Sequence, residues 1–244
     1  MQQGNTAAHA QKTRARSIGY AVILLAVMAG AAQAQSPVRR HEAIALAKNY
    51  ANLRWKPALQ NAFHGRDRDG VWVDTPDAAF VNPGNPPGWW TAGKTNVGVP
   101  DKWGGFSSLR EFREGIKSGQ YAGDVYTTEK RRLLDGAVCQ DAVGIDCSGL
   151  ISRCWRLERS YSTRELPDLC VPLASYEELK PGDILNWENN HVLLFIAFAD
   201  KTHARLLAYE AGSPPDSKVI QDSISVPMLK AFGYKPWRYK KIVD

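Results

Sequence analysis

Asp146-Cys147-Ser148-Gly149-Leu150-Ile151 lies where an irregular segment meets a predicted helix, and the expected architecture follows from this junction. Apolar residues recur at helical spacing over residues 148–157. Further along, Lys180-Pro181-Gly182-Asp183 is typical of a turn and precedes an expected strand over residues 184–187. The nucleophilic side chain of Cys147 is therefore expected at the start of a helix that packs on strands.

The rest of the C-terminal part predicts an antiparallel meander. After one turn an almost wholly apolar strand is expected over residues 191–199, and after a second turn another over residues 204–210. Residues 218–220 and 237–242 are expected to form a last strand pair. A helix followed by such a meander predicts an α+β layer fold.

The N-terminal part is less regular. Residues 39–54 predict an amphipathic helix, and residues 107–117 predict a short one. The Pro-, Gly- and Trp-rich residues 56–105 predict either a structured insertion or a wall of a substrate groove. Residues 121–143 are expected to be irregular, so the whole of residues 56–143 is rich in insertions.

The first 34 residues have the features of a secretory signal peptide. An apolar run over residues 18–32 follows a basic start, and Ala32-Gln33-Ala34 suits signal peptidase. The run is shorter than the ~20 residues of a typical membrane span. An uncleaved anchor is the alternative. We expect export to the periplasm or the exterior, a membrane contact only through this segment, and one mature domain over residues 35–244.

Removal of that segment changes the charge. The whole chain carries +6, but its first 34 residues hold three basic side chains, which leaves 28 basic and 25 acidic residues and a charge of +3. This weak, scattered excess suits an anionic polymer as substrate. It does not predict nucleic-acid binding.

Cys147 is the candidate nucleophile. A helix N-terminus beside an imidazole favours the reactive thiolate. The small neighbours Ser148 and Gly149 allow a substrate backbone to approach closely. A half-cystine or a buried structural thiol is the alternative, and this motif alone does not separate the two.

His191 is the candidate base because it opens an apolar strand, where an unpaired polar side chain is costly. If the two meander strands pair about the turn at residues 200–202, position 191 faces positions 210 to 212. Glu210 then lies at the ~5 Å typical of cross-strand neighbours and can orient the imidazole. His203 lies in the turn, too far along the strand. The alternatives are a strand-end His satisfied by structure and a solvated Glu210.

Asp146-Cys147-Ser148-Gly149-Leu150-Ile151, Leu179-Lys180-Pro181-Gly182-Asp183-Ile184 and His191-Val192 together resemble the NlpC family of papain-like cell-wall cysteine endopeptidases. The match covers about residues 146–210. The resemblance implies a papain-like fold, a Cys–His–polar triad at Cys147, His191 and Glu210, attack on an amide of the peptidoglycan stem peptide, and no cofactor.

The chain departs from the family in one segment. Val97-Gly98-Val99-Pro100-Asp101-Lys102-Trp103-Gly104-Gly105 is similar to the family's Gly-x-Pro-Tyr and Trp-Gly-Gly segment, but Asp101 stands in place of the Tyr that helps to form the oxyanion site. An anionic Asp is a poor oxyanion donor. Tyr121, Tyr126 or backbone N–H groups alone are then expected to replace it. Residues 89–105 are expected to line the substrate groove, and the expected substrate-binding residues are Asp101, Trp103, Tyr126, Asp146 and Ser148.

The other cysteines suggest a structural role. The spacings among Cys139, Cys147, Cys154 and Cys170 contain no C-x₂₋₄-C pair, so a zinc site is not expected. In an exported protein disulfides persist. With Cys147 free, we expect one disulfide, between Cys154 and Cys170.

Two other patterns carry no weight here. Residues 88–95 match the phosphate-loop pattern, but the surrounding prolines exclude the strand and helix that it needs, so no nucleotide is expected. Residues 67–77 hold several Asp residues but lack the closing Glu of a calcium loop, so no metal is expected. The resemblance to the NlpC family thus implies a peptidoglycan amide hydrolase of the γ-D-glutamyl–diamino acid type. A papain-like amidase or esterase on another substrate, or a non-catalytic wall-binding module, is the alternative.

Overall fold

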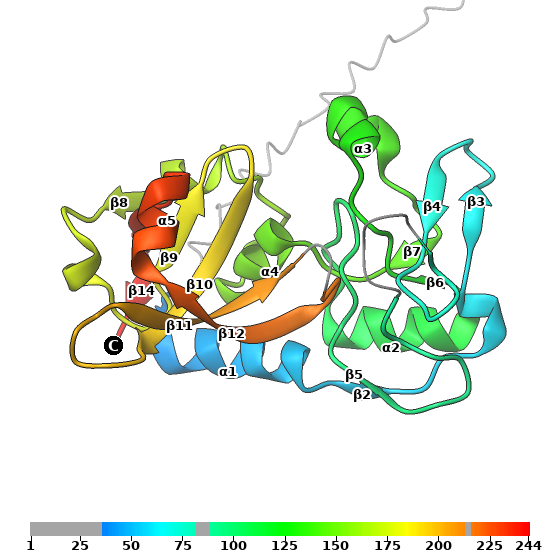
Figure 1. The fold of residues 1–244 in the computed structure, drawn as a ribbon, viewed down its shortest axis with the longest axis horizontal. Coiled ribbons are helices and arrows are strands. Elements are labelled where there is room, and N and C mark those ends of the chain that lie inside the picture. The colour runs from blue at the N-terminus through cyan, green and yellow to red at the C-terminus, as the bar shows by residue number, and fades with distance from the viewer. Residues whose placement is uncertain (1–35, 82–87, 213–215) are drawn as a thin grey trace, which may run out of the picture. The chain divides into compact units, whose positions relative to one another are not determined.

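An antiparallel sheet of six strands, in the order β12-β11-β10-β9-β13-β8, is the centre of the fold (Figure 1). The computed structural model describes residues 36–81, 88–212 and 216–244 of the chain. They belong to one unit, Gln35–Asp244. The predicted signal segment, residues 1–34, lies outside the described residues. No helix among the described residues is long and apolar enough to cross a membrane.

The described part of the chain contains both helices and strands, so the fold is α+β. Its α-helices are α1 (Arg40–Ala51), α2 (Leu109–Ser118), α3 (Thr128–Leu133), α4 (Cys147–Cys154) and α5 (Val226–Phe232). Short 3-10 turns are η1 (Leu59–Asn61), η2 (Leu134–Ala137), η3 (Leu166–Leu169) and η4 (Tyr176–Glu178). The sheet strands are β8 (Cys170–Pro172), β9 (Ile184–Trp187), β10 (His191–Phe198), β11 (Arg205–Ala211), β12 (Val219–Ser225) and β13 (Lys235–Tyr239). The remaining strands form two-stranded pairs: β1 (Val38–Arg39) with β14 (Ile242–Val243), β2 (Arg54–Trp55) with β5 (Asn96–Val97), β3 (His64–Arg66) with β4 (Trp72–Asp74), and β6 (Tyr121–Ala122) with β7 (Ala142–Val143).

Alternation along β10 separates the two faces of the sheet. Val192 and Leu194 belong to the large hydrophobic core together with residues of α1 and α4. Leu193 and Phe195 point the other way, into a second core that includes residues of α5. Because successive side chains of a strand point to opposite faces, one apolar strand serves both layers. The helix that begins with Cys147 is therefore held against the face of the sheet opposite to α5.

Several predicted elements are confirmed. The helix expected after Asp146 is α4, the helices expected over residues 39–54 and 107–117 are α1 and α2, and the expected strand over residues 184–187 is β9. β10 and β11 form the predicted hairpin, with Leu194 opposite Tyr209 and a register shift beyond Phe195.

Two expectations about the chain path were wrong. Residues 218–220 and 237–242 do not form a strand pair, because β12 extends the meander beside β11 whereas β13 lies between β9 and β8. Helix α5 was not expected. It connects β12, at one edge of the sheet, to β13, which lies next to the strand at the other edge. The stretch over residues 121–143 is not irregular throughout, since it contains β6, α3 and β7. Within α3 only Lys130 is buried, so the segment shows no apolar period.

The expected disulfide between Cys154 and Cys170 was also wrong, because all four cysteines are free thiols. Cys154 lies at the end of α4 and Cys170 begins β8, and both are packed as small apolar side chains in the large core. Burial raises the pKa of Cys170 to about 12. Burial likewise raises the pKa of Cys139 to about 12, so these thiols stay neutral.

The backbone of residues 98–107 lies directly against the start of α4. The Asp146 N–H donates to the Gly105 carbonyl oxygen at 3.2 Å. A Cβ atom on Gly149 would lie 2.0 Å from that same oxygen. Position 149 therefore requires glycine, because any side chain there separates the two segments.

We predict that Gly149→Ala destabilises the protein by about 1–3 kcal/mol, as overpacking of a tight contact does. Chemical denaturation of the protein over residues 35–244 measures this loss. Gly136→Ala is the matched control, since a Cβ atom there meets nothing within 4 Å. Its unfolding free energy should stay within ~0.5 kcal/mol of the native value or rise slightly. Equal effects of the two substitutions would contradict the tight contact.

Candidate functional site

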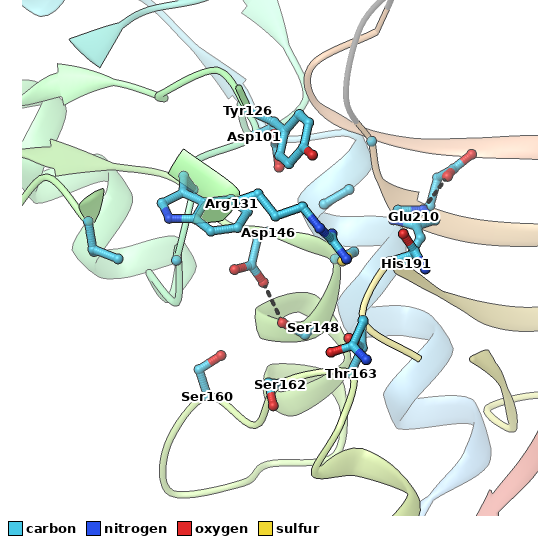
Figure 2. A pocket seen from close by; sticks show the side chains of 18 of the residues that line it. Asp101, Tyr126, Arg131, Asp146, Ser148, Ser160, Ser162, Thr163, His191 and Glu210 are labelled. Carbon is cyan, nitrogen blue, oxygen red and sulfur yellow. Dashed lines mark hydrogen bonds and ion pairs between the residues drawn. The ribbon is translucent and has the colours of Figure 1, made fainter. Parts of the chain in front are cut away.

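A cleft of about 1260 Å³ contains the candidate nucleophile and base. It is larger than the ~300–1,000 Å³ of a typical small-molecule pocket, which suits a peptide or polymer chain. Figure 2 shows how side chains from α4, β10, β11 and the segment around Asp101 meet there. All of the expected catalytic and substrate-binding residues line it, namely Cys147, His191, Glu210, Asp101, Trp103, Tyr126, Asp146 and Ser148.

Cys147 is the first residue of α4 and is half-buried. Asp146 caps the helix, because one oxygen of its carboxylate accepts hydrogen bonds from the Gly149 N–H at 2.6 Å and from the Ser148 hydroxyl at 2.9 Å. Aspartate is among the preferred residues at this position. The thiol thus lies at the positive end of the helix dipole, where negative charge is favoured.

His191 begins β10, and its ring connects two partners. The ring is hydrogen-bonded to Cys147. Its Nε2 atom lies 2.7 Å from Oε2 of Glu210 on the neighbouring strand β11. The predicted cross-strand contact between His191 and Glu210 is therefore confirmed, whereas their catalytic roles stay predictions. Both side chains are mostly covered, with exposed fractions of 22% and 16%.

The charge of this group of side chains sets the protonation of His191. Burial lowers the pKa of the imidazole, but the Cys147 thiolate, the hydrogen bond with Cys147 and that with Glu210 oppose it and raise the pKa to about 10. The imidazolium is favoured because it lies between two negative groups. At neutral pH a pKa of about 10 keeps the His191 ring positively charged beside Cys147.

Aromatic side chains that sequence reasoning missed cover this pair. The Tyr234 ring lies edge-on to the His191 ring, with centroids 6.5 Å apart. Trp187, which is opposite His191 in the β9–β10 ladder, packs on Tyr234 with centroids 5.7 Å apart. Tyr234 follows α5, an element that the sequence pattern did not reveal. A covered ion pair is screened less by water.

Asp101 lies in surroundings that disfavour its anionic form. Its side chain is only 6% exposed. Burial raises the pKa of this carboxyl well above its ordinary value, and the nearby Asp146 carboxylate raises it further, while His191 lowers it. Desolvation beside another carboxylate therefore favours a neutral Asp101 over the anionic residue expected from the sequence in the Tyr position.

The structure separates the two tyrosines considered for the oxyanion site. Tyr126 lines the cleft, and its ring centroid lies 5.7 Å from that of Trp103. Tyr121 does not line it, since its ring stacks on Phe63 at 4.3 Å.

The expected groove wall over residues 89–105 is only partly correct. Asp101, Trp103 and Gly104 line the cleft. Trp89 and Trp90 instead pack around Trp55, with centroids 6.1 and 5.7 Å away. The aromatic residues of this insertion stabilise the N-terminal part more than they shape the cleft.

Three arginines of the cleft were also missed, because nothing in their spacing marks them. Arg159 pairs with Glu165 at 2.8 Å, and Arg164 is hydrogen-bonded to Asn189. Arg131 lies on α3, and its side chain has no ion pair or hydrogen bond with another described residue. Figure 2 shows it extending into the cleft. The cleft therefore offers a positive charge to an anionic group of a ligand.

The other histidines of the described chain serve elsewhere. His64 bridges Asp74 at 3.0 Å and Asp77 at 2.9 Å. His203 pairs with Glu177 and stacks on Phe198. No group of three or more His, Cys, Asp or Glu side chains suited to a metal ion occurs among the residues that the structure describes.

Comparisons with known proteins do not assign this site. No protein-family model matches the chain, and no curated protein matches it. A functional proposal therefore has to rest on the geometry of the described residues.

We predict that Cys147→Ala lowers the pKa of His191 from about 10 to within about one unit of ~6.5, the ordinary value. The sign follows because the substitution removes the negative charge and the hydrogen bond that favour the imidazolium. NMR titration of the His191 ring, assigned with His191→Gln, measures it. Cys139→Ala is the control, because that buried thiol does not line the cleft, and it should leave the titration unchanged. An unchanged value in Cys147→Ala contradicts the ion pair.

Proposed function

We propose that this chain is an exported papain-like cysteine hydrolase that cleaves amide bonds of peptidoglycan stem peptides. The observation that carries the proposal is the chain of contacts from Cys147 to His191 to Glu210 within one cleft. A nucleophile with an adjacent base, itself oriented by a third group, is the arrangement that activates a thiol for covalent catalysis. The motifs shared with the NlpC family and the α+β architecture, with a nucleophile-bearing helix on an antiparallel sheet, support it.

The proposed reaction has two halves. The Cys147 thiolate attacks the amide carbonyl carbon, and the carbonyl oxygen becomes an oxyanion. Protonated His191 then gives its proton to the leaving amine as the C–N bond breaks, which leaves a thioester on Cys147. Neutral His191 next takes a proton from water, whose oxygen attacks the thioester and releases the acid. Glu210 holds the imidazole orientation and stabilises its charged form through both halves.

One side chain of the cleft, Arg131, supports a carboxylate-bearing substrate. Stem peptides joined through a γ-D-glutamyl bond carry a free carboxylate beside the bond that would be cut. Arg131 has no partner among the described residues and can form the paired hydrogen bonds that a guanidinium makes with a carboxylate. The size of the cleft, about 1260 Å³, leaves room for several residues of such a peptide.

We expect the protein over residues 35–244 to release new stem-peptide fragments from purified peptidoglycan, and Cys147→Ala to release none. Mass spectrometry of the digest identifies the bond. Hydrolysis should decline as the pH rises through about 10, because His191 then loses the proton that the leaving amine needs. Alkylation of Cys147 by iodoacetamide needs no such proton and should not decline there. No fragments, with rapid alkylation, would move the search to another amide or ester. No fragments and an inert Cys147 would instead favour a binding module.

The charge argument predicts that Arg131→Ala raises KM for stem peptides by about 10-fold or more, as loss of a charged hydrogen bond worth ~1.5–3 kcal/mol would. Steady-state kinetics on a soluble stem peptide measure it. Arg132→Ala is the matched control, since Arg132 is the next residue of α3 but pairs with Glu129 at 2.6 Å and does not line the cleft. It should leave KM within twofold. If both variants behave alike, Arg131 does not bind the substrate.

A further inference from the structure

Asp101 is fixed beside the nucleophile by its backbone. Asp101 and Ile145 form a parallel bridge, and Ile145 lies two positions before Cys147. The Ile145 N–H donates to the Pro100 carbonyl oxygen at 3.2 Å, and the Lys102 N–H donates to the Ile145 carbonyl oxygen at 3.3 Å. The position of the Asp101 Cα atom relative to α4 is therefore set by hydrogen bonds on both sides.

The Asp101 side chain is mostly buried where it borders the cleft, and no described residue is hydrogen-bonded to its carboxyl. It is 94% covered, since its exposed fraction is 6%. No hydrogen bond or ion pair joins its carboxyl to another described residue, yet it lines the same cleft as Cys147 and His191 (Figure 2). A buried polar group without a partner costs free energy, and so it commonly marks a place where a ligand supplies the partner.

The charged groups around Asp101 determine which carboxyl holds a proton. Those that face it are Asp146 at the start of α4, His191 on β10, and the more remote Asp124 and Lys130. Two nearby carboxylates in a desolvated place cannot easily both be ionised. Burial raises the pKa of Asp146 as well, but its hydrogen bonds from Gly149 and Ser148 oppose that rise. The Asp101 carboxyl accepts no hydrogen bond from the described residues, so a shared proton is favoured on Asp101.

We propose that Asp101 is a catalytic residue whose neutral carboxylic acid donates a hydrogen bond to the oxyanion formed when Cys147 attacks the substrate carbonyl. The inference rests on the proposed cysteine hydrolase function and assigns a donor to it. A carboxylic acid kept neutral in an apolar site can act in this way. The backbone N–H of Cys147, the first residue of α4, has no acceptor within the helix and is suited to be a second donor.

This role accounts for the departure from the NlpC pattern, in which a Tyr hydroxyl takes the same part. Both side chains present one O–H donor at this position, and neither adds negative charge to the developing oxyanion. Tyr126 is the rival donor because it also lines the cleft. It lies in the segment before α3, whereas the residues on either side of Asp101, Pro100 and Lys102, are hydrogen-bonded to Ile145, the residue before the helix cap.

The test compares Asp101→Ala, Asp101→Asn and Tyr126→Phe in the protein over residues 35–244. The acylation rate with p-nitrophenyl acetate reports a step that passes through an oxyanion. Iodoacetamide alkylation of Cys147 reports a step that does not. We expect Asp101→Ala to reduce acylation by ~10²–10³, the usual cost of one lost oxyanion donor. Asp101→Asn keeps an N–H donor of similar shape and should lose less than ~10-fold.

Two further readouts separate this role from a structural one. Alkylation should change less than about threefold in Asp101→Ala, since the attack at an sp³ carbon forms no oxyanion. Carbon-13 NMR of the Asp101 carboxyl should show the protonated form at pH 7, whatever substrate the enzyme prefers. An ionised Asp101 at pH 7 overturns the inference, as does a loss in Tyr126→Phe without one in Asp101→Ala. Neither result bears on peptidoglycan cleavage or on Cys147 reactivity, which test the proposed function separately.

Discussion

The contact between the backbone at Gly105 and the first turn of α4 is the constraint on which the cleft depends. The Gly105 carbonyl oxygen accepts from the Asp146 N–H and leaves no room for a side chain at position 149. This contact holds residues 98–107 beside Cys147, the proposed nucleophile. On its other side α4 packs into the core that includes Val192 and Leu194 of β10, so His191 is fixed as well. The close approach of Gly105 and Gly149 thus helps to bring Cys147, Asp101 and His191 into one cleft.

Electrostatics then couples the side chains that the fold brings together. His191 keeps its proton because Cys147 and Glu210 are on either side of it, whereas burial alone would remove that proton. The pKa of Asp101 is raised for the opposite reason, since burial and Asp146 both oppose its ionisation. The same desolvated region therefore supports a cation at one residue and a neutral acid at another. In each case the neighbouring charged groups and hydrogen-bond partners determine the direction of the pKa shift.

The sequence predicted the elements whose signals are local. The apolar helical pattern after Asp146 located α4, and period and turn residues located β9, β10 and the contact of His191 with Glu210. It could not predict the path of β13, because a strand's partner depends on where α5 carries the chain. Nor could it predict the protonation of Asp101, since burial and the position of Asp146 are tertiary properties. The sequence likewise did not predict that Arg131 lines the cleft, because that position also depends on the tertiary fold.

The proposed chemistry follows from how negative charge is distributed in the cleft. Glu210 and Asp146 are each satisfied, one by the His191 ring and the other by donors of α4. An ionised Asp101 would add a third, unsatisfied carboxylate where the oxyanion must form, and the repulsion would raise the barrier to attack. A neutral Asp101 removes that repulsion and supplies a donor. Arg131, at the same time, adds positive charge for a substrate carboxylate. The departure from the family pattern at position 101 is therefore compatible with amide hydrolysis, provided that its carboxyl stays buried.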